Sequence, residues 1–325
     1  MAGGAGSGHH ETVMRDEVVE LLARVRSGVI VDGTLGMGGH SEALLDATPE
    51  AVRLFGLDRD PGAVESSRAR LARFGARVRL FHRGYEELPD VLAGEGVDGV
   101  AGVVLDLGLS GVQLASDRGF SFSVDAPPDM RFDPTSGPTA ADLIRRMPER
   151  ELADALRTYG ELPGSARLAR RLKDAARHNR MNTTAEFAAA CVEVLGQRVR
   201  KMPGPTLPAQ ALRILVNREL DRLDAFLGAL PAVLASGGRA VVISFHSLED
   251  RRVKRSFRDL ARGGGFAALT RKPDRPGEDE VDRNRRARSA RLRAVERVEG
   301  SGTGTGMEGA GTGTDTGAGM SGAER

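Results

Sequence analysis

Apolar positions in the first third of the chain follow two alternating patterns. Short apolar runs bounded by glycine, proline or aspartate predict buried strands at 28–32, 52–58, 77–81 and 99–106. Helical spacing of apolar residues predicts helices between them, over 13–25, from 41 to 45 and over 61–73. Strands that alternate with helices form a parallel sheet with right-handed crossovers, so the chain is expected to begin as an α/β domain.

The pattern changes after Asp106. Residues 107–139 are rich in Gly, Pro, Ser and Asp, which is typical of a loop, and 140–200 show only helical spacing. A Pro-rich break at 201–208 precedes a further helical stretch at 209–234, which Gly228 and Pro231 are expected to interrupt. The remaining predicted elements are a strand at 238–244, a helix at 248–261 and an edge strand at 292–298.

These elements predict an α/β fold with a parallel-rich sheet and an inserted all-helical part. We expect the sheet domain to combine 13–110 with 209–299, and the inserted loop and helical domain to cover 111–208. Residues 1–12 are expected to be flexible. Residues 300–325 are rich in Gly and Thr and nearly free of apolar side chains, which predicts a disordered tail.

Composition narrows the class of protein. The chain has 325 residues, of which 40% are hydrophobic and 28% charged, as in globular proteins. No apolar run is long enough to span a bilayer, and the first ten residues lack the order of a signal peptide, so we expect a cytoplasmic protein. The single cysteine, Cys191, excludes an internal disulfide and a cysteine-based zinc site, and we expect no metal.

The net charge of +2 does not by itself indicate nucleic-acid binding. Basic residues are nevertheless clustered at 167–180, 251–258 and 283–297. Such clusters either follow a phosphate backbone or are ordinary solvated faces, and the sequence leaves both interpretations open.

A glycine-rich turn follows the first predicted strand. Gly36 and Gly38 fit the first two positions of G-x-G-x-x-G, while Ser41 holds the third. Asp58 ends the second strand about twenty residues later, where an acid accepts hydrogen bonds from ribose hydroxyls. Together, the glycine-rich turn and Asp58 favour a nucleoside-containing cofactor. Asp32, at the end of the first strand, favours S-adenosylmethionine over NAD because a carboxylate there can meet a cationic amino acid moiety.

Further polar residues follow the later strands. Asp106 ends the fourth strand, at the sheet edge where ligands bind in such folds. Ser244 and His246 follow the next predicted strand and are candidate catalytic residues together with Asp106. A Ser/His hydrolase is disfavoured because the sequence lacks a G-x-S-x-G elbow. The loop 125–133 is similar to the acid-Pro-Pro-aromatic loops of amino-group methyltransferases, although Asp129 stands where the aromatic residue is expected.

Seven ordered blocks, over about residues 10–298, resemble the bacterial ribosomal small-subunit RNA (cytosine-N4) methyltransferases. The blocks are Asp32-Gly-Thr-Leu-Gly-Met-Gly-Gly-His40, Leu57-Asp-Arg-Asp-Pro61, Leu105-Asp-Leu-Gly108 with Gln113, Arg118-Gly-Phe-Ser-Phe122 with Asp129-Met-Arg131, Ala211-Leu-Arg-Ile214 with Val216-Asn217, Ile243-Ser-Phe-His-Ser-Leu-Glu-Asp-Arg251, and Arg286-Ala-Arg-Ser289.

The resemblance implies a class I, Rossmann-like methyltransferase fold and methylation of the N4 amine of a cytidine in the decoding region of 16S rRNA. The implied partners are small-subunit rRNA or the assembled subunit, with a homodimer as one option for the enzyme. Together with Asp32 and Gly36, the expected S-adenosylmethionine-binding residues are those that the resemblance carries over, namely Gly38, Gly39, His40, Asp58, Tyr85, Asp106 and Gln113. Phe120, Phe122 and Phe245 are candidates to hold an unstacked base.

Two internal segments depart from the family pattern. Gly111-Val112 replaces a usual Ser-Pro before Gln113, and Leu207-Pro-Ala209 replaces a usual Arg-Thr-Phe. These departures concern local loop geometry and RNA contacts, and the expected activity does not depend on them. The alternatives are a methyltransferase for another RNA or DNA base, a nucleotide-dependent oxidoreductase and a non-catalytic RNA-binding protein.

Overall fold

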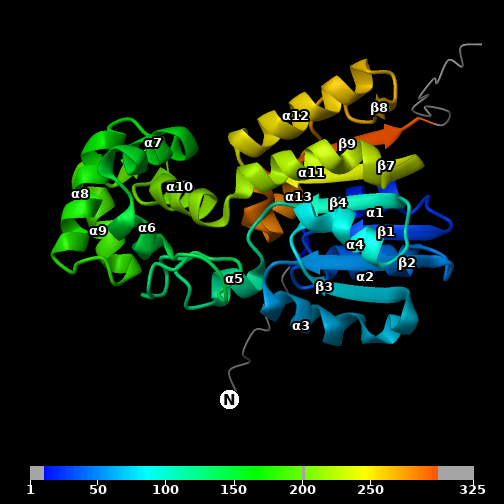
Figure 1. Cartoon of the computed structure of the whole chain (residues 1–325), viewed down its shortest axis with the longest axis horizontal. Coiled ribbons are helices and arrows are strands. Elements are labelled where there is room, and N and C mark those ends of the chain that lie inside the picture. The colour runs from blue at the N-terminus through cyan, green and yellow to red at the C-terminus, as the bar shows by residue number, and fades with distance from the viewer. Residues whose placement is uncertain (1–10, 200–201, 299–325) are drawn as a thin grey trace, which may run out of the picture.

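A computed structural model describes residues 11–199 and 202–298, and it shows a sheet-based core with a helical lobe at one end (Figure 1). The predicted tail lies outside the described residues, as does nearly all of the predicted flexible N-terminus. The main sheet has seven strands in the order β3-β2-β1-β4-β7-β9-β8. Its strands are β1 Gly28–Asp32, β2 Val52–Asp58, β3 Val78–His82, β4 Val100–Asp106, β7 Leu234–Ser244, β8 Phe266–Ala268 and β9 Arg291–Arg297.

The first five strands of this order pair in parallel, and only β9 and β8 are antiparallel. This mostly parallel α/β arrangement confirms the predicted fold class. Alternate residues of β1 face opposite sides of the sheet: Val29 and Val31 join one core, while Ile30 joins another. Both faces are therefore covered by helices, which is why the strands read as continuous apolar runs in the sequence.

The helices divide between the two faces of the sheet. On one face lie α4 Leu88–Gly94, α11 Glu219–Val233 and α12 Ser247–Arg262. On the other lie α1 Arg15–Leu22, α2 Gly39–Ala47 and α3 Pro61–Leu71. A short helix, α13 Glu278–Arg283, docks on the start of α1 through the Glu280 carboxylate, which accepts from the Met14 amide at 2.8 Å.

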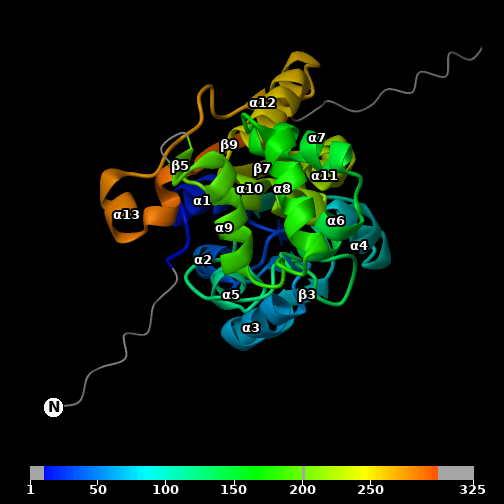
Figure 2. The same cartoon turned by 90° about the vertical axis from the view of Figure 1, so that its left-hand side faces the viewer.

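The helical lobe has its own apolar core and lies beyond the carboxyl ends of the parallel strands (Figures 1 and 2). It contains α6 Ala140–Arg146, α7 Glu149–Gly160, α8 Ser165–Arg177, α9 Thr184–Leu195 and α10 Thr206–Asn217. A two-stranded ribbon, β5 Arg198–Val199 with β6 Met202–Pro203, follows α9. Ala211 and Leu212 of α10 are buried in the core of the lobe, although the sequence analysis assigned this segment to the sheet domain.

Several predicted boundaries were wrong. The helical stretch 209–234 is two helices, because Arg218 adopts a left-handed φ of 51° between α10 and α11. Gly228 and Pro231 do not interrupt α11, and β7 begins at Leu234, four residues before its predicted start. The predicted loop after Asp106 contains the short helix α5 Gly111–Ala115. Within the described ranges, no helix combines the length and apolar character needed to cross a membrane.

Candidate active site

The glycine-rich turn connects β1 to α2 and lines a cavity at the carboxyl edge of the sheet. Gly36 and Gly38 have φ values of 51° and 76°, which L side chains rarely adopt. Gly33 is tightly packed for a different reason, since a Cβ there would overlap the Leu105 side chain and lie 2.9 Å from the Tyr85 Cβ. The turn therefore lies close against β4 and presents its backbone to the cavity.

Asp32 is buried under this turn. Its carboxylate accepts from the Thr34 amide at 3.2 Å and from the Ser41 hydroxyl at 2.7 Å. Burial raises the pKa of Asp32, against the opposing effect of nearby His40. The side chain stabilises the turn and is not among the residues that line the cavity, whereas the sequence analysis placed it against a ligand.

Asp58 lies at the end of β2 and lines the cavity. One carboxylate oxygen accepts from the Gly36 amide and the other from the Asp60 amide, both at 2.8 Å. Each oxygen keeps a second lone pair, so the group can still accept two hydrogen bonds from a ligand. Burial raises the pKa of Asp58 to about 6, although both amides favour the charged form.

His40 and Asp106 face each other across the cavity floor. The His40 Nε2 atom lies 3.6 Å from an Asp106 carboxylate oxygen, and the two side chains are 5% and 23% exposed. Both ring nitrogens of His40 and the Oδ1 atom of Asp106 are buried without a hydrogen-bond partner among the described residues. Buried polar atoms are almost always paired, so unpaired atoms at a cavity wall indicate a polar ligand.

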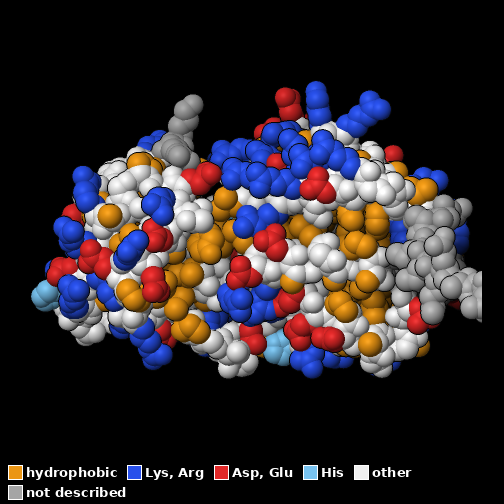
Figure 3. All heavy atoms as spheres, turned by 45° about the horizontal axis from the view of Figure 1, so that its top comes forward, with side chains coloured by type: hydrophobic (Ala, Val, Ile, Leu, Met, Phe, Trp, Pro, Cys, Tyr) orange, Lys and Arg blue, Asp and Glu red, His pale blue; other side chains and the backbone are white. Residues whose placement is uncertain are grey.

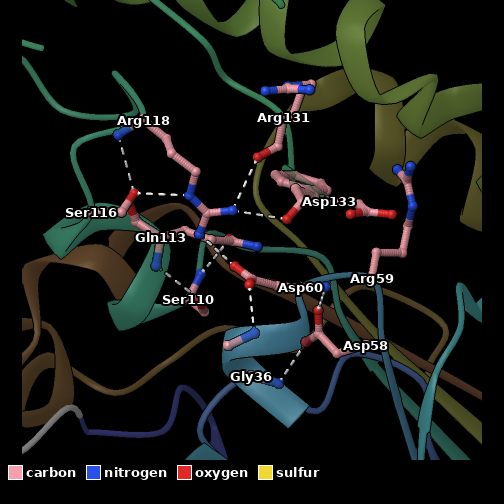
Figure 4. A network of polar contacts seen from close by, with 12 residues as sticks. Gly36, Asp58, Arg59, Asp60, Ser110, Gln113, Ser116, Arg118, Arg131 and Asp133 are labelled. Carbon is pink, nitrogen blue, oxygen red and sulfur yellow. Dashed lines mark hydrogen bonds and ion pairs between the residues drawn. The ribbon is translucent and has the colours of Figure 1, made fainter. Parts of the chain in front are cut away.

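Gln113 closes the cavity from the loop after β4. It caps the short helix α5, where its side-chain oxygen accepts from the Ser110 amide at 3.0 Å. Further along this loop, Arg118 forms an ion pair with Asp60 and donates to the Arg131 and Phe132 carbonyls at 3.2 and 2.9 Å (Figure 4). The loop is thereby held against the Asp58–Asp60 segment that follows β2.

The far end of the cavity is formed by residues from the other sheet face and the lobe junction: Tyr85, Phe132, Glu219, Leu223 and Glu249. The Glu249 carboxylate accepts from the Phe245 amide at 2.8 Å and lies 3.0 Å from His246 Nε2. Burial alone would raise the pKa of Glu249, but His246 and Arg213 outweigh it and hold this pKa below its usual range. Burial also raises the pKa of the Tyr85 hydroxyl, which keeps that group neutral.

Glu219, His246 and Glu249 also place three potential metal-ligating atoms within 4.8 Å of one another. Glu219 already binds Arg213 through both oxygens, at 2.8 and 2.9 Å. A cation at this position would compete with the Arg213 guanidinium and would lie close to its positive charge. We therefore assign no metal to this cluster.

The cavity opens to solvent, and its wall combines the glycine turn and the acids at the strand ends with residues of the lobe junction. Residues 7–298 match the sequence pattern of the MraW methylase family. The chain belongs to this family.

Two relatives of this MraW-family methylase carry the name Ribosomal RNA small subunit methyltransferase H. The protein from Sorangium cellulosum is 46% identical over 294 residues, which are 90% of this chain and 92% of the relative. The protein from Geobacter sp. strain M21 is 44% identical over 312 residues, which are 89% of this chain and 99% of the relative. The similarity therefore extends over both the sheet core and the helical lobe.

The methylase brings most of the predicted site residues to one cavity. Gly36, Gly39, His40, Asp58, Tyr85, Asp106 and Gln113 line it. Gly38 forms the N-cap of α2 beside them. Ser244 instead donates to the carbonyl of its β9 partner Arg291 at 3.4 Å and is not among the residues that line the cavity. His246 caps α12 and reaches the cavity only through Glu249.

Sequence reasoning missed Glu219, Glu249 and Phe132 as lining residues of this methylase. Glu249 belongs to a quoted block, and its position three residues after His246 signals the capping box that it forms. Of the aromatic candidates, Phe120 stacks on Phe132 with ring centroids 5.8 Å apart. Phe122 stacks on Phe187 of the lobe, with centroids 6.1 Å apart, and Phe245 packs against Gly108.

Asn217 joins the lobe to the cavity loop in this methylase. Its buried amide accepts from the Phe132 amide and donates to the Met130 carbonyl, both at 2.7 Å. Replacing Asn217 with alanine leaves both backbone groups unpaired, so we expect a loss of about 2–5 kcal/mol in the free energy of unfolding. Urea unfolding of Asn217→Ala and of the exposed control Asn182→Ala should differ clearly. Equal unfolding midpoints would contradict this role for Asn217.

Proposed function

We propose that this protein transfers a methyl group from S-adenosylmethionine to the exocyclic N4 amine of a cytidine in the decoding region of 16S rRNA. The observation that carries the proposal is one cavity in a member of a methylase family. One end of its wall has residues suited to a nucleoside, and the other end has buried carboxylates and an aromatic ring. Both relatives are named as methyltransferases of small-subunit ribosomal RNA, which supports RNA as the substrate class.

The residues present fit S-adenosylmethionine. The free lone pairs of Asp58 suit the two ribose hydroxyls, and the unpaired polar atoms of His40 and Asp106 suit the polar parts of the cofactor. Gly36 and Gly39 bring backbone to the cavity wall, and Gly38 provides the left-handed turn beside them. Tyr85 and Gln113 complete the proposed cofactor wall. When bound, the cofactor supplies a methyl group activated by its sulfonium charge.

The chain's own residues must orient the amine, which is a poor nucleophile because its lone pair is delocalised into the cytosine ring. Glu249 lines the cavity wall, where its carboxylate can accept an N–H of the amine, and Asp106 is a second acceptor in the alternative that it does not hold the cofactor. Glu249 stays ionised because its pKa is lowered, so it remains an acceptor at neutral pH. Phe132, backed by Phe120, offers an aromatic face for the unstacked base. Alignment of this kind supplies on the order of 7–11 kcal/mol in favourable cases.

The direct test is methyl transfer from labelled S-adenosylmethionine to small subunits from a strain that lacks the corresponding gene. Nucleoside analysis after digestion should show N4-methylcytidine at one position of the decoding region. Label in another base, or in DNA but not in RNA, would overturn the proposed specificity while keeping a methyltransferase. Parallel assays with naked 16S rRNA decide whether the substrate is the RNA or the assembled subunit.

The raised pKa of Asp58 predicts a pH dependence of cofactor binding. Only the carboxylate accepts two ribose hydrogen bonds, so affinity should be full above pH 7 and fall as the pH drops through about 6. At pH 5 we expect S-adenosylmethionine to bind about tenfold more weakly than at pH 7. Calorimetric titrations at both pH values measure this change.

Unfolding caused by protonation of Asp58 cannot explain weaker cofactor binding at low pH. A carboxyl group with a raised pKa binds more protons in the folded state, so between its ordinary pKa near 3.8 and about 6 it lowers stability as the pH rises. The control is Asp58→Asn, whose weakened binding should no longer change over this pH range. Binding by the unsubstituted protein that is equal at pH 5 and pH 7 would refute the assignment.

A further inference from the structure

The outer face of α12 carries an excess of positive charge. Leu248, Val253 and Phe257 point into the core. The basic side chains on the remaining faces of the helix are Arg251, Arg252, Lys254, Arg255, Arg258 and Arg262. Figure 3 shows Lys and Arg side chains gathered over this helix.

Acidic neighbours neutralise only part of this charge. Arg252 pairs with Asp224 at 3.0 Å, Arg251 approaches Glu161 at 3.7 Å, and Arg258 and Arg262 share Asp259. Lys254 and Arg255 are exposed and have no acidic partner within 4.0 Å in the part of the chain that the structure describes. These two cations therefore remain available to an anionic partner.

The other basic clusters of the sequence are used differently. In 167–180, Arg170 and Arg171 pair with Glu149 and Glu193, and Lys173 donates to two backbone carbonyls, while Arg177 and Arg180 are exposed. The cluster 283–297 uses Arg291 and Arg293 to bind Asp250. Its exposed arginines, Arg285, Arg286 and Arg288, follow the acidic helix α13. The face of α12 differs from both in lying beside a groove that its own basic side chains line.

A groove runs beside this face, between the core and the helical lobe. Its walls include Arg255 and Ser256 of α12, Leu227 of α11, and Arg157 and Leu162 of the lobe. Arg255 stands on the α12 side of these apolar residues, and Arg157, which pairs with Asp154 at 2.8 Å, stands on the lobe side. The two acidic lining residues, Glu161 and Asp224, pair with Arg251 and Arg252, so the lining keeps an excess of positive charge. This combination suits a polyanion whose backbone also offers less polar surface, as the sugar-phosphate chain of RNA does.

The groove is distinct from the active-site cavity. Along α11, Glu219 and Leu223 line the cavity, whereas Asp224 and Leu227 line the groove. Along α12, Glu249 belongs to the cavity and Leu248 to the groove. The two sites thus lie on different sides of the same helix pair. A nucleotide bound in the groove is therefore not the one that reacts in the cavity.

We propose that the outer face of α12 and this groove form a docking surface for the phosphate backbone of the substrate RNA, away from the target base. The inference rests on the proposed function, because it takes RNA as the substrate. Phosphate contacts position an RNA without reading its sequence. The surface should therefore contribute to substrate affinity and leave the chemical step unchanged.

The test compares Lys254→Glu/Arg255→Glu with Arg24→Glu/Arg26→Glu in the full-length protein. Arg24 and Arg26 are also exposed, and replacing both with glutamate changes the charge by the same amount. They precede β1, at the amino ends of the parallel strands, on the side of the sheet opposite the cavity. For the α12 variant we expect the KM for small subunits to rise at least tenfold, with kcat within twofold and S-adenosylmethionine affinity unchanged. The control variant should keep a KM close to that of the unsubstituted protein.

Filter binding of naked 16S rRNA gives a readout independent of activity. Loss of two phosphate contacts should reduce the slope of log affinity against log salt concentration by about 1.5. Equal RNA affinity for the two variants would overturn the proposal. A defect confined to assembled subunits would also overturn it, because it would indicate an acidic protein partner. Failure of the unsubstituted protein to methylate RNA would refute the proposed function instead, and RNA binding would still test the surface.

Discussion

Replacing Asp106 with asparagine is expected to lower methyl transfer to RNA at least a hundredfold. The carboxylate ends β4 on the cavity wall, with one oxygen buried and unpaired and the other 3.6 Å from His40. Asparagine keeps the shape but removes the charge and replaces one acceptor with a donor. A hundredfold loss corresponds to about 2.7 kcal/mol of transition-state stabilisation. Single-turnover methylation of small subunits under saturating cofactor measures it.

The same variant separates the two roles that Asp106 can have. Weakened S-adenosylmethionine binding by calorimetry would assign the carboxylate to the cofactor, the role that we favour, whereas intact binding with lost turnover would assign it to the target amine. The matched control is Asp90→Asn, since Asp90 is exposed on α4 away from the cavity. Near-normal turnover of Asp106→Asn at saturating cofactor and RNA would refute both roles.

Residues at strand ends were the most predictable part of this site. Asp58 and Asp106 end parallel strands that pair with β1 on its two sides, and parallel strands bring their carboxyl ends to one edge. Periodicity locates such strands, so it also locates the residues that follow them. The glycine turn after β1 could be placed for the same reason, and its glycines do have the positive φ values that the motif requires.

The direction of a side chain at that edge could not be predicted in the same way. Asp32 and Asp58 both end strands, yet Asp32 turns under the glycine loop to Ser41 while Asp58 lines the cavity. Ser244 ends β7 and faces the Arg291 carbonyl on β9. Those partners are 9 and 47 positions away in the chain, beyond what local spacing can indicate.

Contributions from distant segments were missed for a related reason. Glu219 begins α11 immediately after the left-handed Arg218, and no periodic pattern marks that break. Phe132 is positioned by Asn217, which lies 85 residues further along the chain. Charge neutralisation is equally non-local: Arg171 and Glu193 meet only because α8 and α9 pack together. The three basic clusters therefore looked alike in the sequence, although they differ in the folded chain.

Replacing Asp58 with alanine should weaken S-adenosylmethionine binding at least tenfold, and more than a hundredfold if both ribose hydrogen bonds are lost in full. Each ribose hydrogen bond to a charged acceptor contributes roughly 1.5–3 kcal/mol, and two such bonds would be lost. The substitution also releases the Gly36 and Asp60 amides, which Asp58 holds at 2.8 Å, so the glycine turn loses part of its preorganisation. Isothermal titration of folded protein at pH 7.5 gives the dissociation constant.

Asp58→Asn separates these two effects. Asparagine can still accept from one of the two amides, so the turn should be better ordered than in Asp58→Ala, while the charged ribose acceptor is lost in both. We therefore expect the asparagine variant to melt close to the unsubstituted protein and yet to bind the cofactor at least tenfold more weakly. If both variants fold and bind S-adenosylmethionine as tightly as the unsubstituted protein, Asp58 does not hold the ribose, and the glycine turn must contact the cofactor without it.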